Sequence, residues 1–487
     1  MPARPFLRAT VGVAVCLACT TGTSAAQAPA SFLDARQAQE DFDVLHRALA
    51  EAHGGYARFV ARPELERRLT AHRARLARPV RQLELAAILS EAIAELRDGH
   101  ARLELDSATL SALATAPLLP LRVALEGDRL IVRLNESPVD RTIVPGMEVV
   151  RINGRSAAEL VSALLPKVSG DGSIETGRRY RLAQDLARLH WLFIEQAASF
   201  TVLARDASGR EVTAILPGVT DAERRTVVNP VNATLVERRA RLDGPPGRIA
   251  LEFLADGRVA RLRVRAFDGE DFVATLDSVF RELRARRTAS LVLDLRGNGG
   301  GVDEYGARLV SYFVDEPFRY FDRIHVTTIA PSFATWLPRT FDAMRTGTVA
   351  DSAGGFLVTP ALHPGVGPQP PAPNGFGGRL VVLIDGGSFS TTADVAAQLR
   401  SRNRAVFVGE ETAGTYEGNT SGLNALIVLP NSRLRLRVMM YGYWNAVTPV
   451  AGGRGVIPEH RAPSRVADLL AGRDPALELA VALSDPR

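Results

Sequence analysis

The hydrophobic and polar positions of the chain follow three patterns in succession. From Ser31 to about residue 113, apolar residues recur every three or four positions, as in FLDARQAQEDFDVLHRALAEAH, which is typical of amphipathic helices. The next hundred residues carry short alternating runs such as LPLRVAL and RLIVRL, which predict strands joined by tight turns. From Gly244 onward, predicted strands and helices alternate, which favours an α/β layer with a mainly parallel sheet. The sequence therefore predicts a helical cap over 31–115, a β-rich module over 118–219 and an α/β domain over 244–487.

The N-terminal residues have the pattern of a secretory signal over 1–26. Two arginines precede an apolar run that is too short to span a bilayer, and small residues lead up to Ala26. Cleavage there predicts an exported protein, periplasmic or extracellular, with no transmembrane segment in the mature chain. Both cysteines, Cys16 and Cys19, lie in this segment, so the mature protein would have no thiol for a disulfide, a nucleophile or a metal site. A lipoprotein anchor at Cys19 is the alternative.

The net charge and the choice of basic residues exclude some functions and mechanisms. The net charge of +5, from 59 basic and 54 acidic residues, is too mild to indicate nucleic-acid binding. All but one of the basic residues are arginines, and the single lysine, Lys167, lies in the β-rich module. A serine–lysine dyad inside the α/β domain is therefore excluded.

The first strand-to-helix junction that carries unusual residues is SLVLDLRGNGGGVDEYG. Glycines such as Gly299 and Gly300 let backbone amides point into a cavity at a helix N-terminus, where partial positive charge favours an anion. The alternative is a plain tight turn with a structural Asp294–Arg296 pair. A dinucleotide fingerprint would need a third glycine where Val302 stands, so a nucleotide cofactor is not expected.

The second junction is LVVLIDGGSFSTTADVAAQL, which places Ser390 at the start of a helix after a buried strand. A hydroxyl there can project from the sheet edge, and the amide of Thr391 can donate to a developing oxyanion. The alternative is that Ser390 only caps the helix. Ser388 is a second candidate nucleophile, but it lies farther from the helix amides.

A nucleophilic serine needs a base, and with lysine excluded the base must be histidine. Of the eight histidines, His100 differs because it follows Asp98-Gly99, where a predicted helix breaks and the chain resumes as a strand. A loop at that break can present the imidazole to a neighbouring domain. Glu411, in VFVGEETAGTYEGNTSG, could orient the base, although such acids more often face solvent.

Four motifs, in this order, together resemble the C-terminal-processing and tricorn-type serine peptidases. LRDGHARL resembles the segment with the base histidine, LVLDLRGNGGG the oxyanion strand and GSFSTTAD the nucleophile turn, while VGEETAGTYEGNTSG with GRGVIPEH resembles the C-terminal signatures. The segment IVPGMEVVRINGRSAAELVSALL resembles a PDZ-like module. The resemblance implies a crotonase/ClpP-like α/β peptidase core with an N-terminal helical cap and a PDZ-like β-rich module.

By this resemblance, Ser390 is the nucleophile, His100 the general base, and the amides of Thr391 and of Gly299 or Gly300 form the oxyanion hole. Neither a metal nor an organic cofactor is implied. The lysine of the processing branch falls on Thr415, which favours the tricorn-like histidine branch.

The chain departs from the family at two further positions, where tricorn-like members have a second serine and a glutamate. Here those positions correspond to Gly99 and Gly452, so Asp98 or Glu411 would have to orient the base. The expected substrates are polypeptides, unfolded or with free C-termini, recognised by strand addition to the module. A non-catalytic polypeptide-binding protein and a hydrolase of small acyl esters remain the alternatives.

Overall fold

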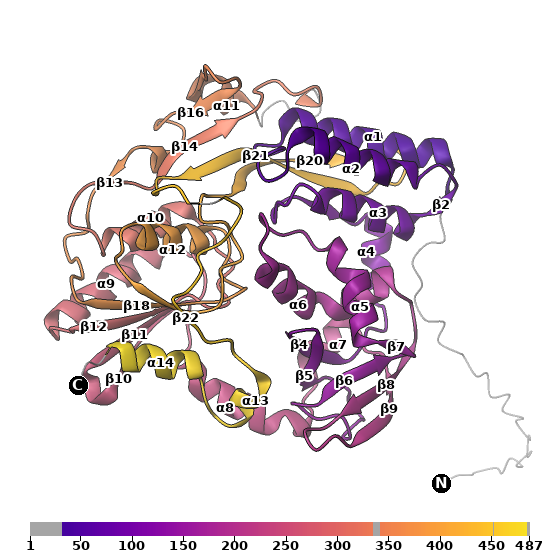
Figure 1. Cartoon of the computed structure of the whole chain (residues 1–487), viewed down its shortest axis with the longest axis horizontal. Coiled ribbons are helices and arrows are strands. Elements are labelled where there is room, and N and C mark those ends of the chain that lie inside the picture. The colour runs from indigo at the N-terminus through magenta and orange to yellow at the C-terminus, as the bar shows by residue number, and fades with distance from the viewer. Residues whose placement is uncertain (1–31, 335–340, 451, 485–487) are drawn as a thin grey trace, which may run out of the picture.

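The structure is a computed structural model of the chain, and it describes residues 32–334, 341–450 and 452–484. The predicted signal over 1–26 lies outside the described residues. The chain has a mixed helix and sheet fold, in which the N-terminal helices, the β-rich part and the C-terminal part occupy different sides of the molecule (Figure 1). None of the described helices combines the length and apolar character needed to cross a membrane.

The first part is built of helices that turn apolar residues toward one core. Helix α1 (Ala35–Ala52) buries Phe42, Leu45 and Leu49 at three- and four-residue spacing and begins at a capping box formed by Asp34 and Gln37. The other elements of this part are α2 (Arg62–Ala74), α3 (Gln82–Ala94), α4 (Ser107–Ala114) and the short strands β1 (Phe32–Leu33), β2 (Val80–Arg81) and β3 (Arg102–Glu104). The loop between α3 and β3 holds His100.

The second part is an antiparallel sheet with its own core. Its strands are β4 (Leu121–Glu126), β5 (Arg129–Asn135), β6 (Glu148–Ile152), β7 (Arg155–Ser156), β8 (Ser199–Arg205) and β9 (Glu211–Pro217), and they pair in the order β4-β5-β6-β8-β9 with β7 beside β6. Helix α5 (Ala157–Leu164) begins at the capping box of Ser156 and Glu159. A short 3₁₀ turn, Leu165–Lys167, follows it.

Helix α6 (Glu175–Phe193) is the main element of this part that the strand-rich expectation for 118–219 did not include. Its buried positions include Leu182, Leu186 and Trp191, which have helical spacing. Arginines and other polar residues separate these positions, so no continuous apolar stripe marks the helix in the sequence. Helix α6 packs along β4 and closes the side of the module that faces the cap.

The α/β layer follows two connecting helices, α7 (Asp221–Thr226) and α8 (Ala233–Asp243). Its sheet has the order β10-β11-β12-β18-β19-β22, in which all neighbours are parallel except β10 and β11. The strands span Ile249–Leu254, Val259–Val264, Ser290–Asp294, Arg379–Ile384, Val406–Gly409 and His460–Arg461. The helices of this layer are α9 (Phe272–Ala285), α10 (Asp303–Ser311), α12 (Thr391–Ser401) and α14 (Pro475–Ser484), whereas α13 (Val466–Leu470) packs against α8 and β5. The expectation of a mainly parallel α/β layer agrees with this topology.

A second, antiparallel sheet was not expected from the sequence. It has the order β15-β16-β14-β21-β20, with strands Thr348–Ala350, Phe356–Val358, Phe321–Val326, Arg435–Asn445 and Thr420–Val428. The short helix α11 (Asp342–Gly347) and the pair β13 (Phe318–Arg319) and β17 (Pro368–Gln369) lie beside it. Strand β21 also pairs with β3 of the first part, so the N-terminal and C-terminal parts of the chain share one sheet.

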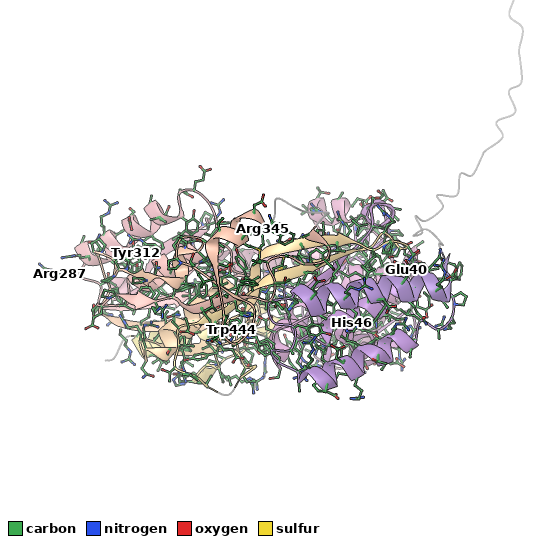
Figure 2. All side chains as sticks on the ribbon, turned by 90° about the horizontal axis from the view of Figure 1, so that it is seen from above. Glu40, His46, Arg287, Tyr312, Arg345 and Trp444 are labelled. Atoms are coloured by element: carbon green, nitrogen blue, oxygen red, sulfur yellow. The ribbon has the colours of Figure 1, made fainter. Side chains whose placement is uncertain are left out.

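The packing of apolar side chains joins the first part to the last. One continuous hydrophobic core contains Phe42 and Leu89 of the N-terminal helices together with Leu293, Val395 and Tyr443 of the C-terminal part. Strands β20 and β21 extend beneath α1 and α2 in Figure 1. Seen from above, His46 and Glu40 of α1 lie in one half of the molecule, and Tyr312 and Arg287 lie in the other half (Figure 2). The β-rich module has a separate core.

Candidate active site

Ser390 lies in a tight turn between β18 and α12. Its backbone has φ 56° and ψ −131°, a combination that L-residues rarely adopt. Its side chain makes no hydrogen bond that caps α12, so the hydroxyl is not used as a helix cap. Strain of this kind persists where the surroundings fix it, and it projects the hydroxyl away from the sheet.

Ser388, the second candidate nucleophile, has a different environment. Its hydroxyl donates to the carbonyl of Leu295 at 3.0 Å and accepts the amide of Asp385 at 3.1 Å. The residue is fully buried. Its hydroxyl therefore holds the turn to the neighbouring strand and is not offered to the surface.

His100 lies against Ser390, although the two residues are 290 positions apart in the chain. The distance between His100 Nε2 and Ser390 Oγ is 3.1 Å. The imidazole packs on the ring of Phe389 at a centroid distance of 4.4 Å, which holds its orientation. Burial lowers the pKa of His100 to about 4, because desolvation disfavours the imidazolium. The nitrogen Nδ1 is buried and has no hydrogen-bond partner.

Asp98 connects the loop of His100 to two distant segments through hydrogen bonds. Its Oδ1 accepts the backbone amide of His100 at 2.7 Å and lies 3.9 Å from His100 Nδ1. Its Oδ2 is bound by His53 Nε2 at 2.6 Å and by the hydroxyl of Thr420. Although burial alone would raise it, the pKa of Asp98 lies well below its usual value, because these donors and the nearby imidazoles stabilise the carboxylate.

The protonation of His53 follows from its two hydrogen bonds. His53 Nδ1 accepts the backbone amide of Gly55 at 3.1 Å, so the ring proton resides on Nε2 and is donated to Asp98. His53 comes from the end of α1, and Thr420 begins β20. Three segments distant in sequence therefore meet at one buried carboxylate.

A half-buried arginine, Arg58, connects the segments around this carboxylate. Arg58 donates to the carbonyls of Glu417, Asn419 and Tyr443 at 2.9, 3.1 and 2.8 Å. Its guanidinium also lies over the ring of Trp444, 4.4 Å from the centroid. These contacts tie the loop after α1 to the start of β20.

Asp171 is a second buried carboxyl beside the histidine loop. Its Oδ1 accepts the amide of Gly99 at 2.6 Å, while its Oδ2 is buried without a partner. A side chain at Gly99 would place its Cβ 3.0 Å from Asp171 Oδ1, so glycine lets the carboxyl approach. Burial and the charge of Asp98 raise the pKa of Asp171 to about 7.

The glycine turn after β12 lies next to Ser390, because β12 and β18 are parallel neighbours and their carboxyl ends share one edge. Gly300 has φ +102°, and a Cβ there would lie 2.7 Å from Ser390 Cβ and 3.1 Å from the amide nitrogen of Thr391. The amide of Gly300 donates to Asn298 Oδ1 at 2.9 Å. Among the hydrogen bonds of the described residues, none uses the amide of Gly299, which leaves it available to a ligand.

Glu411, the other acid considered for orienting the base, is engaged elsewhere. Its carboxylate pairs with Arg454 through two contacts of 2.8 Å and accepts the amide of Gly455 at 2.9 Å. It is absent from the residues that line the cleft around Ser390.

Ser390 and His100 open into a cleft of about 1270 Å³ between the three parts of the molecule. Apolar side chains from the cap and from α6, including Leu103, Leu113, Leu192 and Phe193, form one wall. The glycine turn and the start of α10 form another. A cleft of this size accommodates several residues of an extended chain.

Two groups of side chains in the described residues have a composition that could hold a metal ion. In Asp98, His100 and Asp171, one potential ligand atom of each residue lies within 4.8 Å of the others. The second group, Asp303, Glu304 and His363, lies at the start of α10, where His363 Nε2 binds Asp303 at 3.0 Å. Serine-based acyl transfer needs neither group to hold a metal.

Sequence reasoning did not single out His53, Asp171 or Thr420. His53 and Asp171 each precede a glycine, a context that is common for residues in ordinary turns. The run HGGY at the end of α1 was the available signal for His53, since a histidine in a glycine-rich turn resembles the DGH turn around His100. Asp171 and Thr420 had no local signal.

Comparison with known proteins supports a peptidase. Residues 258–459 match the family model described as Peptidase family S41. Mature CPAF has 17% sequence identity to the chain and a TM-score of 0.61, covering 92% of this chain and 96% of that one. Mature CPAF complexed with lactacystin gives 15% identity and a TM-score of 0.62, covering 92% and 98%.

These TM-scores and coverages show a shared fold over nearly the whole chain. The search of curated proteins found no match. The family match spans β12 with its glycine turn, the turn of Ser390 and the strand that leads to Glu411. The match to peptidase family S41 covers residues 258–459, less than half of the chain, and together with the shared fold it supports a serine peptidase.

Proposed function

We propose that this chain is an exported serine endopeptidase of the C-terminal-processing type, in which Ser390 is the nucleophile and His100 the general base. The observation that carries the proposal is the 3.1 Å distance between His100 Nε2 and Ser390 Oγ. That distance lies within the reach required for proton transfer. Nothing local in the sequence brings these residues together.

In the proposed reaction, Ser390 Oγ attacks the carbonyl carbon of a peptide bond, and its proton moves to His100 Nε2. The imidazolium then gives that proton to the departing amine, which leaves an acyl-enzyme on Ser390. Water enters, loses a proton to His100 and attacks the ester, and His100 then returns the proton to Ser390 Oγ as the acid product leaves. The low pKa of His100, near 4, keeps the imidazole unprotonated and able to accept at neutral pH.

The oxyanion of the tetrahedral intermediate is proposed to bind the amides of Gly299 and Thr391. The amide of Gly300 already donates to Asn298, which makes Gly299 the better candidate of the two glycines. Gly300 instead provides the space that Ser390 needs, because a Cβ there would meet the serine side chain. Each donor of this kind contributes about 3 kcal/mol to the transition state.

The architecture proposed for this activity is a crotonase/ClpP-like α/β core with an N-terminal helical cap and a PDZ-like module. The cap supplies His100, and the core supplies Ser390. The module's separate hydrophobic core is consistent with a recognition unit. Its proposed ligands are unfolded chains or free C-termini that add as a strand to its sheet. Export is proposed from the composition of residues 1–26.

Labelling with a fluorophosphonate tests the nucleophile directly. The wild-type chain should be labelled, and Ser390→Ala should abolish both the labelling and the cleavage of casein. Ser388→Ala is the matched control, because the Ser388 hydroxyl is bound to the carbonyl of Leu295. This variant should still be labelled at Ser390. An unlabelled wild type, together with casein cleavage that persists in Ser390→Ala, would refute the proposal. Ester turnover without peptide cleavage would instead favour an acyl-ester hydrolase.

A further inference from the structure

The imidazole of His100 lacks a partner on the side away from Ser390. To accept the serine proton at Nε2, the neutral ring must carry its own proton on Nδ1, and a buried Nδ1–H needs an acceptor. His100 Nδ1 has none. Asp98 Oδ1 is 3.9 Å away and already accepts the backbone amide of the same residue. The other oxygen of Asp98 is taken by His53 and Thr420.

Asp171 has a hydrogen-bond acceptor that lacks a donor. Its Oδ2 is buried and without a partner, and one oxygen of this carboxyl lies within 4.8 Å of a ring nitrogen of His100. A buried polar atom without a partner is costly, and each of these two neighbouring residues has one. The remaining gap is longer than a hydrogen bond, as is common in catalytic sites before substrate binds.

The position of Asp171 is fixed from both sides of the site. The amide of Gly172 donates to the carbonyl of Arg97 at 2.8 Å, and the amide of Ser173 donates to the carbonyl of Gly453 at 2.7 Å. Oδ1 is held by the amide of Gly99, directly before the base. The segment that carries the carboxyl is therefore held beside the histidine loop, and the carboxyl or the ring has to turn for the two to pair.

We propose that Asp171 is the positioning residue of the catalytic base: it accepts a hydrogen bond from His100 Nδ1–H in the reacting complex and stabilises the imidazolium that forms. Asp98 then holds the backbone of the histidine loop, and Asp171 selects the tautomer of its ring. This inference rests on the proposed function, because it assigns a partner to His100 acting as the base.

The proposal requires Asp171 to be ionised when the enzyme works. The charged groups that face it are Asp98, His100, Arg181, Arg58 and, more distantly, Asp394. Asp98 and burial raise the pKa of Asp171 to about 7, against the arginines and the amide of Gly99, which lower it. Since the pKa of His100 lies near 4, a fall in activity as the pH drops through about 7 would reflect Asp171 rather than the base.

The variant Asp171→Asn separates this role from a structural one. Asparagine keeps an oxygen for the amide of Gly99 but offers an N–H group to His100, which favours the wrong tautomer. We expect kcat to fall at least about 10-fold with KM nearly unchanged, as for loss of a group that orients a base. The acid limb of kcat/KM should move from near pH 7 toward lower pH. Asp106→Asn is the matched control, since Asp106 is also buried and accepts backbone amides, at the start of α4, and should leave both unchanged.

Spectroscopy reads the tautomer without substrate. In ¹⁵N-histidine-labelled protein, His100 should carry its proton on Nδ1 in the wild type and on Nε2 in Asp171→Asn. A variant that keeps the wild-type kcat, acid limb and tautomer would overturn the positioning role, provided that fluorophosphonate still labels Ser390. Absence of labelling in the wild type would instead overturn the proposed function. The two failures are therefore distinguishable.

Discussion

Replacement of His53 by phenylalanine tests whether the buried contact between the end of α1 and Asp98 stabilises the fold and the site. Phenylalanine keeps a ring of similar size in a position that is 1% exposed. It removes Nε2–H, which binds Asp98 at 2.6 Å, and Nδ1, which accepts the amide of Gly55 at 3.1 Å. The change therefore removes two hydrogen bonds and creates little empty space.

The expected cost follows from these two bonds. A hydrogen bond to a buried carboxylate contributes about 1.5–3 kcal/mol, and the half-buried amide of Gly55 adds about 1 kcal/mol when it loses its acceptor. Asp98 keeps Thr420 and the amide of His100 as donors, so it remains partly satisfied. The free energy of unfolding should fall by about 2–4 kcal/mol, and kcat should fall because the loop that carries the base loosens.

Urea unfolding in a Ser390→Ala background, which removes self-cleavage, measures the stability, and casein cleavage by the otherwise wild-type chain measures activity. His46→Phe is the matched control, because His46 binds Glu66 at 2.7 Å but both side chains are about one-third exposed (34% and 35%). That variant should lose less than about 1 kcal/mol. Equal losses for the two variants would refute the argument that burial makes the His53–Asp98 contact strong.

Three further results are expected. Gly300→Ala should reduce casein cleavage at least about 100-fold, because its Cβ would lie 2.7 Å from that of Ser390. Gly299→Ala should cleave casein at nearly the wild-type rate, because its Cβ would meet nothing within 4 Å. Equal cleavage rates for the two variants would contradict this prediction. Asp294 is fully buried, and the arginines around it lower its pKa. Its contribution to stability is therefore present above the unfolded pKa near 4 and is lost as the pH falls below that value. Asp294→Asn should lower the free energy of unfolding in urea at pH 7 by about 3–5 kcal/mol and should make stability less dependent on pH in the acid range. Arg58→Met should remove three hydrogen bonds from the guanidinium to backbone carbonyls and lower the thermal midpoint by several degrees, measured by circular dichroism. An unchanged midpoint would show that water replaces the guanidinium.

Local signals in the sequence explain why the core of the candidate site was predictable. The glycine turn after β12 and the turn before α12 each combine a buried strand, glycines and a helix start within about fifteen residues. Strands of this kind in a parallel sheet end at one edge, so the proximity of Gly300 and Ser390 follows from the topology. The position of His100 could be suspected only from the break at Asp98-Gly99 and from the resemblance to a peptidase family.

The remaining parts of the site depend on packing between distant segments. Asp171 and Thr420 are ordinary turn and strand residues in the sequence, and only the meeting of the cap, α6 and β20 gives them their partners. The same reason explains the missed second sheet, since β20 and β21 pair with each other and with β14 and β3 across long stretches of chain. The helix α6 was missed because arginines interrupt its apolar face.

The cap and the α/β layer share one hydrophobic core and therefore do not form separate domains. The cap and the α/β layer were predicted as separate domains, over 31–115 and 244–487, yet their apolar side chains form one continuous core. β3 of the cap also pairs with β21, next to the loop that carries His100. Removing the cap would therefore expose the underside of β20 and β21 in addition to removing the base. The proposed catalytic unit is therefore the cap and the α/β layer together with the segment around Asp171, whose carboxyl accepts the amide of Gly99. The strands β4 to β9, which belong to the separate core of the module, are the part that can be altered without displacing Ser390 or His100.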